Sequence, residues 1–228
     1  MKHVPICGLF GRRGVGKTSL ARAVSRHQPR VVVWDYLGEY GPLALRSEGN
    51  LSALDDYLTW AERHRFAAAR YIPENGGTDE FEEVCALVYG YENLLFVVEE
   101  AAVVCQASYL PPQFGRIVRQ GRHRGIGLLW TTQRLNEVSR TLTGLTDAWA
   151  GFHLSEPADL TALAARCGRG YAESIAALPR FGWLGYDVDS QGTFDDIDRL
   201  KALWGAPKTW SLHNAVTGLR TGSVGTGT

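Results

Sequence analysis

The sequence has no net charge and no apolar run long enough to cross a membrane. Its 228 residues carry 24 basic and 24 acidic side chains, so it lacks the positive excess with which a polybasic protein coats nucleic acid. A bilayer-spanning helix needs about 20 consecutive apolar residues, and no run in the sequence approaches that length. The N-terminal residues lead directly into a strand-like segment, so we expect no secretory leader.

Cysteine is also scarce. The four cysteines (7, 85, 105 and 167) lie far apart and form no C-x-x-C pair, which argues against a zinc site or a disulfide framework. Four small buried side chains in a reducing compartment are the expected alternative. The sequence is nevertheless 45% hydrophobic, with seven tryptophans, so it can fill one sizeable core.

The zero net charge is a cancellation between blocks of opposite sign. Residues 1–34 carry seven basic side chains and no acid, whereas residues 35–100 carry fourteen acids and four bases. Residues 101–136 again lack acids and carry five arginines. Opposite-sign blocks on one small domain are what self-complementary, head-to-tail assembly requires.

Apolar runs of strand length alternate with segments of helical spacing. This alternation predicts an α/β fold with a mostly parallel central sheet and helices on both faces. We place the domain at residues 1–205 and expect the Gly/Thr-rich segment 206–228 to be a flexible tail or one that a partner orders. The predicted strands are 4–10, 30–36, 66–72, 94–98, 126–132, 148–154 and 181–188, and the predicted helices are 18–27, 51–65, 79–90, 111–124 and 157–167.

A glycine-rich loop between the first predicted strand and helix matches the phosphate-loop pattern G-x-x-x-x-G-K-[ST]. Backbone N–H groups of such a loop, and the start of the following helix, bind phosphate oxygens. Lys17 would reach the β- and γ-phosphates of ATP, and the Thr18 hydroxyl would bind Mg²⁺. The alternative is a glycine-rich turn that binds nothing. The candidate nucleotide-binding residues are Gly11, Arg12, Arg13, Gly14, Val15, Gly16, Lys17, Thr18 and Ser19.

Polar side chains follow two further predicted strands. Glu99 and Glu100 end the apolar run 94–98, and ligands bind at the carboxyl edge of such sheets. We expect Glu99 to hold Mg²⁺ and Glu100 to be the general base that activates water. Gln133 would sense the γ-phosphate, or it begins an ordinary turn. The acids could equally form a charged strand end that faces solvent.

An arginine-rich segment precedes the strand at 126–132. Arg116 and Arg119 share a helix face, and Arg122 lies between glycines. An arginine offered to the γ-phosphate of a neighbouring subunit accelerates hydrolysis, and Arg122 is our candidate, with Arg119 next. Contact with DNA phosphates and a solvated basic face are the alternatives.

Four of these segments together resemble the HerA–FtsK superfamily of DNA-pumping P-loop ATPases. They are GRRGVGKT, RVVVWD followed by Gly-Glu-Tyr at 38–40, LLFVV ending in two acids, and RQGRHRGIGLLWTTQR. The family usually has Asp-Glu where this chain has Glu99-Glu100. The short length makes the chain similar to the genome-packaging ATPases of tectivirus-like, membrane-containing phages and archaeal viruses.

The resemblance implies a RecA-like (ASCE) domain that works as a pentameric or hexameric ring. It further implies ATP sites at subunit interfaces, Mg²⁺ as cofactor and double-stranded DNA in the pore. A capsid vertex or membrane protein would be a further partner, and the location would be the host cytoplasm or the virion. The pore contact would come from the loop 106–115, which combines an aromatic residue with prolines.

Two other functions remain open at this point. A small-molecule kinase also needs a phosphate loop and arginines, but it has no evident use for adjacent glutamates and Gln133 at two strand ends. A nucleotide-binding assembly or switch protein would hydrolyse ATP slowly and bind a protein partner. DNA-stimulated hydrolysis would distinguish the translocase from both.

Overall fold

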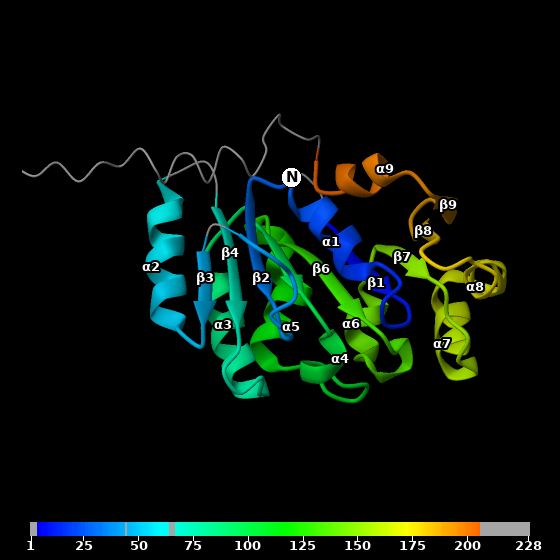
Figure 1. Cartoon of the computed structure of the whole chain (residues 1–228), viewed down its shortest axis with the longest axis horizontal. Helices are drawn as coiled ribbons and strands as arrows, with labels where there is room; N and C mark the ends of the chain where they lie inside the picture. Colours follow the sequence, from blue (N-terminus) through cyan, green and yellow to red (C-terminus); the bar gives the residue numbers. More distant parts are fainter. Residues whose placement is uncertain (1–3, 44, 64–66, 206–228) are drawn as a thin grey trace, which may run out of the picture.

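A computed structural model describes residues 4–43, 45–63 and 67–205 of the chain. Within these residues a single nine-stranded sheet has the order β3-β4-β2-β5-β6-β1-β7-β8-β9, and its long central strands run side by side in Figure 1. The strands are β1 (Ile6–Phe10), β2 (Arg30–Trp34), β3 (Leu45–Glu48), β4 (Ala67–Ile72), β5 (Leu95–Val98), β6 (Gly127–Thr132), β7 (Ala148–Phe152), β8 (Trp183–Asp187) and β9 (Gly192–Phe194).

Helices cover both faces of this sheet. Side chains of α1 and α9 pack with one set of buried strand residues, and side chains of α2, α3, α5, α7 and α8 pack with the other. The helices are α1 (Lys17–Ser25), α2 (Leu51–Glu62), α3 (Thr78–Gly90), α4 (Ala101–Val104), α5 (Pro112–Gln120), α6 (Arg140–Gly144), α7 (Pro157–Cys167), α8 (Arg169–Ala176) and α9 (Ile197–Ala202), with 3₁₀ turns η1 (Gly121–Arg124) and η2 (Leu135–Glu137).

The predicted fold class is confirmed. All pairings from β3 to β7 are parallel, and the strands β2, β5, β6 and β7 are buried along almost their whole length. Strands buried on both faces appear in the sequence as continuous apolar runs without polar alternation. These runs are what predicted the parallel sheet.

The edges of the sheet depart from the sequence prediction. β8 and β9 are antiparallel to their neighbours, and the short β3 and β9 were not predicted. Edge strands of three or four residues carry too few apolar positions to produce a period. The predicted helix 111–124 is α5 up to Gln120 and then η1, which ends at Gly125 with a φ of 68°.

No helix of the described residues is long and apolar enough to cross a membrane. All four cysteines are buried and carry free thiols. The tail predicted for 206–228 lies outside the described residues.

Candidate active site

The phosphate loop connects β1 to α1 at the carboxyl end of the sheet. Gly14 and Gly16 have φ angles of 74° and 108°, which glycine adopts without the steric cost of a side chain. Gly16 is also the N-cap of α1, so the loop passes directly into the first helical turn. The N–H groups of that turn have no partner within the helix and, together with the helix dipole, favour an anion at this position.

The ammonium group of Lys17 lies inside this loop. Its Nζ donates hydrogen bonds to the carbonyl oxygens of Gly11, at 2.9 Å, and Arg12, at 3.1 Å. The side chain is only 7% exposed. Burial lowers the pKa of Lys17, while the charges of Glu100 and Glu99 oppose that shift. The predicted lysine and both predicted carboxylates therefore share one electrostatic environment, as a phosphate site with a metal requires.

Glu99 is buried at the end of β5, beside the start of α1. Its backbone N–H donates to the Trp34 carbonyl at 3.0 Å, and the Thr18 hydroxyl hydrogen-bonds its side chain. Burial is the main cause that raises the pKa of Glu99 to about 7, and the Thr18 hydrogen bond opposes this rise. The structure therefore brings together the two residues predicted to hold a metal.

Magnesium fits this pair on the chemistry of its donors. Among the described residues the buried Oε1 of Glu99 has no hydrogen-bond partner, and an unpaired buried oxygen is costly. Mg²⁺ prefers carboxylate and hydroxyl oxygens and keeps several waters. A hard cation bound by Glu99 and Thr18 would satisfy the orphaned oxygen and would favour the charged form of the carboxylate.

Glu100 and Gln133 meet at the same edge. Gln133 Nε2 donates to Glu100 Oε1 at 3.0 Å, and the Glu100 backbone N–H donates to Thr131 Oγ1 at 3.1 Å. Glu100 adopts a left-handed conformation with φ 51° and ψ 55°, which is uncommon for a residue with a side chain. Such strain persists where the surrounding contacts impose it, and it is frequent at functional sites. The sequence predicted both residues but not the bond between them.

A buried polar network lies on the other side of Glu99. Asp35, which follows β2, accepts the Tyr40 N–H with both carboxylate oxygens at 3.1 Å and pairs with Arg70 Nη1 at 3.2 Å. Its pKa is raised by burial, against the opposing effect of Tyr40 and Arg70. The Tyr40 hydroxyl in turn lies 2.7 Å from Ser25 Oγ on α1. This network ties β2 and β4 to the helix that carries Thr18.

Sequence reasoning noted Asp35 and Tyr40 only through the family resemblance, and it missed Arg70 and Ser25. The available signal was an acid directly after the β-branched strand 30–34. Nothing local indicated Arg70, which lies 35 residues away. A second tie was also missed: Arg134 Nε lies 3.0 Å from Oδ2 of the fully buried Asp159 and joins the segment after β6 to α7.

The arginines of α5 and η1 lie away from the phosphate loop of their own chain. They precede β6, whereas the phosphate loop follows β1, which runs parallel to β6. Arg122 and Arg124 of η1 are therefore separated from the loop by a six-residue strand, about 20 Å at 3.3 Å per residue. Arg122 cannot act on its own phosphate loop without a large rearrangement.

Among these arginines, Arg122 is the one whose side chain contacts neither a backbone carbonyl nor another side chain by a hydrogen bond, ion pair or ring contact in the part of the chain that the structure describes. Arg116 stacks on the Tyr89 ring at 4.2 Å, and Arg124 lies 3.5 Å from a Glu92 carboxylate oxygen. Arg119 donates to the Gly115 carbonyl at 3.5 Å. Arg122 is exposed, so its guanidinium is the one most available to a second molecule.

Comparisons with known proteins give a sequence relative and structural neighbours. No protein-family model matches the chain. "Protein P9" of Pseudoalteromonas phage PM2 is 29% identical over 140 residues, which span 59% of this chain and 62% of that protein, less than two thirds of its length.

Solved structures give a longer match. The genome-packaging NTPase B204 of Sulfolobus turreted icosahedral virus 2, in complex with ATPγS, aligns with a TM-score of 0.70 and 22% identity over 85% of this chain and 97% of that one. The conjugation coupling protein TcpA of pCW3, with ATPγS, aligns with a TM-score of 0.58 and 14% identity over 96% of this chain and 66% of that one. Identities this low show the fold alone. The chain has the fold of a P-loop NTPase and, as its motifs predicted, this fold resembles that of the viral genome-packaging NTPase B204.

Proposed function

We propose that the protein is an ATP-hydrolysing, double-stranded DNA translocase that works as a viral genome-packaging motor. The observation that carries the proposal is the convergence of Lys17, Thr18, Glu99, Glu100 and Gln133 at one edge of the sheet. A phosphate loop with a buried metal-type carboxylate, a candidate base and an amide held on that base is suited to hydrolysis of a phosphoanhydride. The packaging NTPase that shares the fold binds ATPγS.

Each residue then has a chemical role in hydrolysis. The loop 11–19 binds the phosphates, and Lys17 neutralises charge on the β- and γ-phosphates. Glu99 and Thr18 would hold Mg²⁺, which when bound offsets the charge of the phosphate oxygens. Glu100 takes a proton from water as the water oxygen bonds to the γ-phosphorus and the bond to the β–γ bridging oxygen breaks.

Gln133 couples the γ-phosphate to the base. Its amide nitrogen is held by Glu100, and an amide offers both a donor and an acceptor. In the nucleotide-bound state, the Gln133 amide would also bond a γ-phosphate oxygen or the attacking water.

Arg122, or Arg119 after it, would complete the site of a neighbouring subunit. The position of Arg122 at the amino end of β6 prevents action in cis and supports head-to-tail assembly, since such contacts place one edge of a subunit against the opposite edge of the next. We propose a pentamer or hexamer with DNA in its pore, acting in the host cytoplasm or at a capsid vertex. The segment 106–115, which was expected to be a loop but enters α5 at Pro112, is the candidate pore contact, with Tyr109 exposed at 45%.

The test is ATP hydrolysis with and without double-stranded DNA, in wild type and in Lys17→Ala, Glu100→Gln and Arg122→Ala. We expect DNA to stimulate the wild type and each substitution to abolish most activity. Mixing Arg122→Ala with Glu100→Gln should restore activity, because mixed rings contain interfaces with an intact base and an intact arginine. A strict monomer whose hydrolysis ignores DNA would refute the translocase. Failed rescue in rings shown to contain both variants would exclude the trans arginine.

A further inference from the structure

The phosphate loop divides the carboxyl edge of the sheet into two sides. β6 and β5, which lead into Gln133, Glu99 and Glu100, lie on one side of β1, and β7 and β8 lie on the other. On the proposed function, the γ-phosphate must face the carboxylates. The nucleoside of the same molecule must then extend the opposite way, over the ends of β7 and β8. No residue has so far been assigned to bind it.

Phe152 at the end of β7 connects the phosphate loop to that side. A Cβ added to Gly11 would lie 2.6 Å from the Phe152 Cβ, and one added to Gly16 would lie 3.5 Å from its ring, so Phe152 packs directly on the loop. Phe152 pairs with Trp183, the first residue of the antiparallel β8. The segment just before β8 therefore lies at the same edge, two strand spacings or about 10 Å from β1, which is the scale of a nucleoside.

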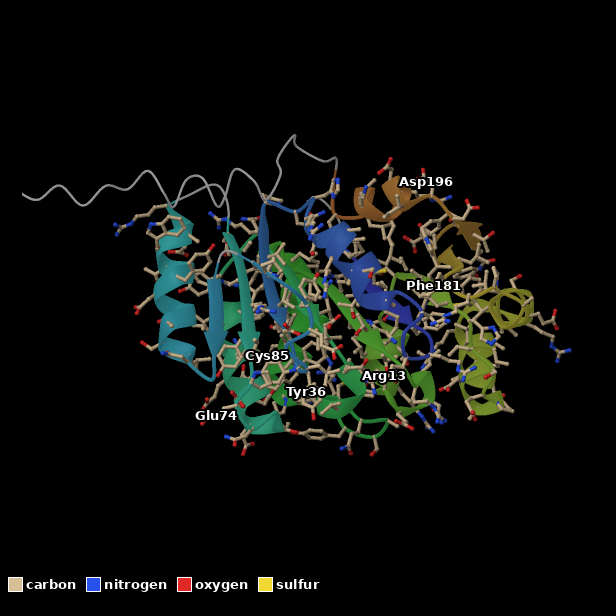
Figure 2. All side chains as sticks on the ribbon, in the orientation of Figure 1. Arg13, Tyr36, Glu74, Cys85, Phe181 and Asp196 are labelled. Atoms are coloured by element: carbon tan, nitrogen blue, oxygen red, sulfur yellow. The ribbon has the colours of Figure 1, made fainter. Side chains whose placement is uncertain are left out.

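That segment presents an exposed aromatic ring in a strained backbone. Phe181 is 60% exposed, and its φ of 68° is left-handed, a conformation that is rare for bulky residues. A turn closed by Gly182 N–H to the Pro179 carbonyl at 3.0 Å holds it. The Arg180 guanidinium lies 4.8 Å from the ring centre. Figure 2 labels Phe181 and the phosphate-loop residue Arg13 in the same half of the molecule.

A polar group with an unused nitrogen lies at the same edge. His153 directly follows β7, and within the described residues its buried Nδ1 has no hydrogen-bond partner. A buried nitrogen without a partner carries a desolvation cost that a ligand can remove.

We propose that Phe181 and His153 form the base subsite of the nucleotide. One face of the Phe181 ring stacks on the flat base, and the Arg180 guanidinium holds the other face through a cation–π contact. His153 bonds a polar atom of the nucleoside. Stacking on an aromatic ring accepts every base, because each base has a π-face. The left-handed turn keeps the ring pointing outward, where a base can reach it.

The test compares a nucleotide with a ligand that has three linked phosphates but no nucleoside. Titration calorimetry with Mg²⁺ would measure the affinity of ATPγS and of inorganic tripolyphosphate for wild type, Phe181→Ala, Phe181→Gly and Phe181→Tyr. We expect about a ten-fold loss for ATPγS in the Ala and Gly variants, no change for tripolyphosphate, and near wild-type values for Tyr. His153→Ala should weaken ATPγS alone in the same way.

Two controls separate the ring from the backbone. Phe181→Gly removes the ring and also relieves the left-handed strain, so a loss shared with Phe181→Ala comes from the ring. Val188→Ala, an exposed site beyond the far end of β8, should change neither affinity.

Three results would overturn the proposal. Unchanged ATPγS affinity in both ring-deleted variants would refute the base subsite and leave the proposed function intact. An equal loss for both ligands, or weaker assembly with an unchanged ratio of the two affinities, would place Phe181 at a contact with another subunit. A wild type that binds neither ligand would refute the proposed function, and the subsite with it.

Discussion

The buried Glu99 makes the stability of the nucleotide-free protein depend on pH. Its side chain is 4% exposed, and burial raises its pKa from 4.5 to about 7. Because the folded pKa is the higher one, Glu99 costs nothing below pH 4.5, where both states bind the proton. The cost grows between pH 4.5 and 7, where the unfolded state has lost the proton and the folded state still binds it, and it is complete above pH 7, where both states have lost it. The full difference corresponds to about 3 kcal/mol.

Glu99→Gln keeps the size and the hydrogen-bonding groups of the side chain but cannot ionise. We expect Glu99→Gln and wild type to have similar free energies of unfolding near pH 4.5. Above pH 7 the variant should be more stable by about 3 kcal/mol. Urea unfolding followed by circular dichroism, from pH 4.5 to 8 without nucleotide or metal, measures this difference.

Asp187→Asn is the matched control, because the pKa of Asp187 is shifted in the opposite direction to that of Glu99. The Ser190 N–H and hydroxyl donate to the Asp187 carboxylate, and these bonds lower its pKa. Asp187 therefore stabilises the fold at neutral pH and loses that effect as pH falls through its folded pKa. A stability difference between Glu99→Gln and wild type that is the same at every pH would refute the reasoning about Glu99.

Two further substitutions test the packing that supports the site. Gly8→Ala would place a Cβ 2.5 Å from the buried Trp130 ring and should lower the free energy of unfolding by about 1–3 kcal/mol. Its control is Gly90→Ala, whose Cβ would meet nothing within 4 Å, so stability should be unchanged or slightly higher. Equal unfolding midpoints for the two variants would contradict this. Arg70→Met leaves the buried Asp35 without its ion-pair partner and should lower the free energy of unfolding by about 3–5 kcal/mol. A decrease below about 1 kcal/mol in urea unfolding would show that Asp35 does not depend on the pair.

Features that depend only on residues close together in the chain were predictable from the sequence. The phosphate loop needs glycines at fixed spacing followed by Lys17 and Thr18, because its conformation and chemistry are local. Glu99 and Glu100 were identifiable because five apolar residues precede them, and a parallel strand places its last residues at the ligand-binding edge. The same local logic predicted the buried strands and most of the helices.

Contacts between distant segments were not predictable. The Asp35–Arg70 pair joins residues 35 apart, and the Gln133–Glu100 bond joins residues 33 apart. No periodicity records such a partner, since the sheet order decides which strand ends become neighbours. The left-handed Glu100 was also missed, because local propensity argues against that conformation and tertiary contacts impose it.

The sequence by itself determined the chemistry available to this protein: a loop that binds phosphate, a pair of carboxylates, an amide and a basic segment. The tertiary structure alone decided where these groups act. By placing β6 between β1 and β5, it gathers the carboxylates and Gln133 on one side of the phosphate loop, and it leaves β7, β8 and Phe181 on the other. By starting β6 at the opposite edge, it directs Arg122 away from its own loop. The physical reason is that side-chain type is a property of a residue, whereas proximity depends on the order in which buried strands pair.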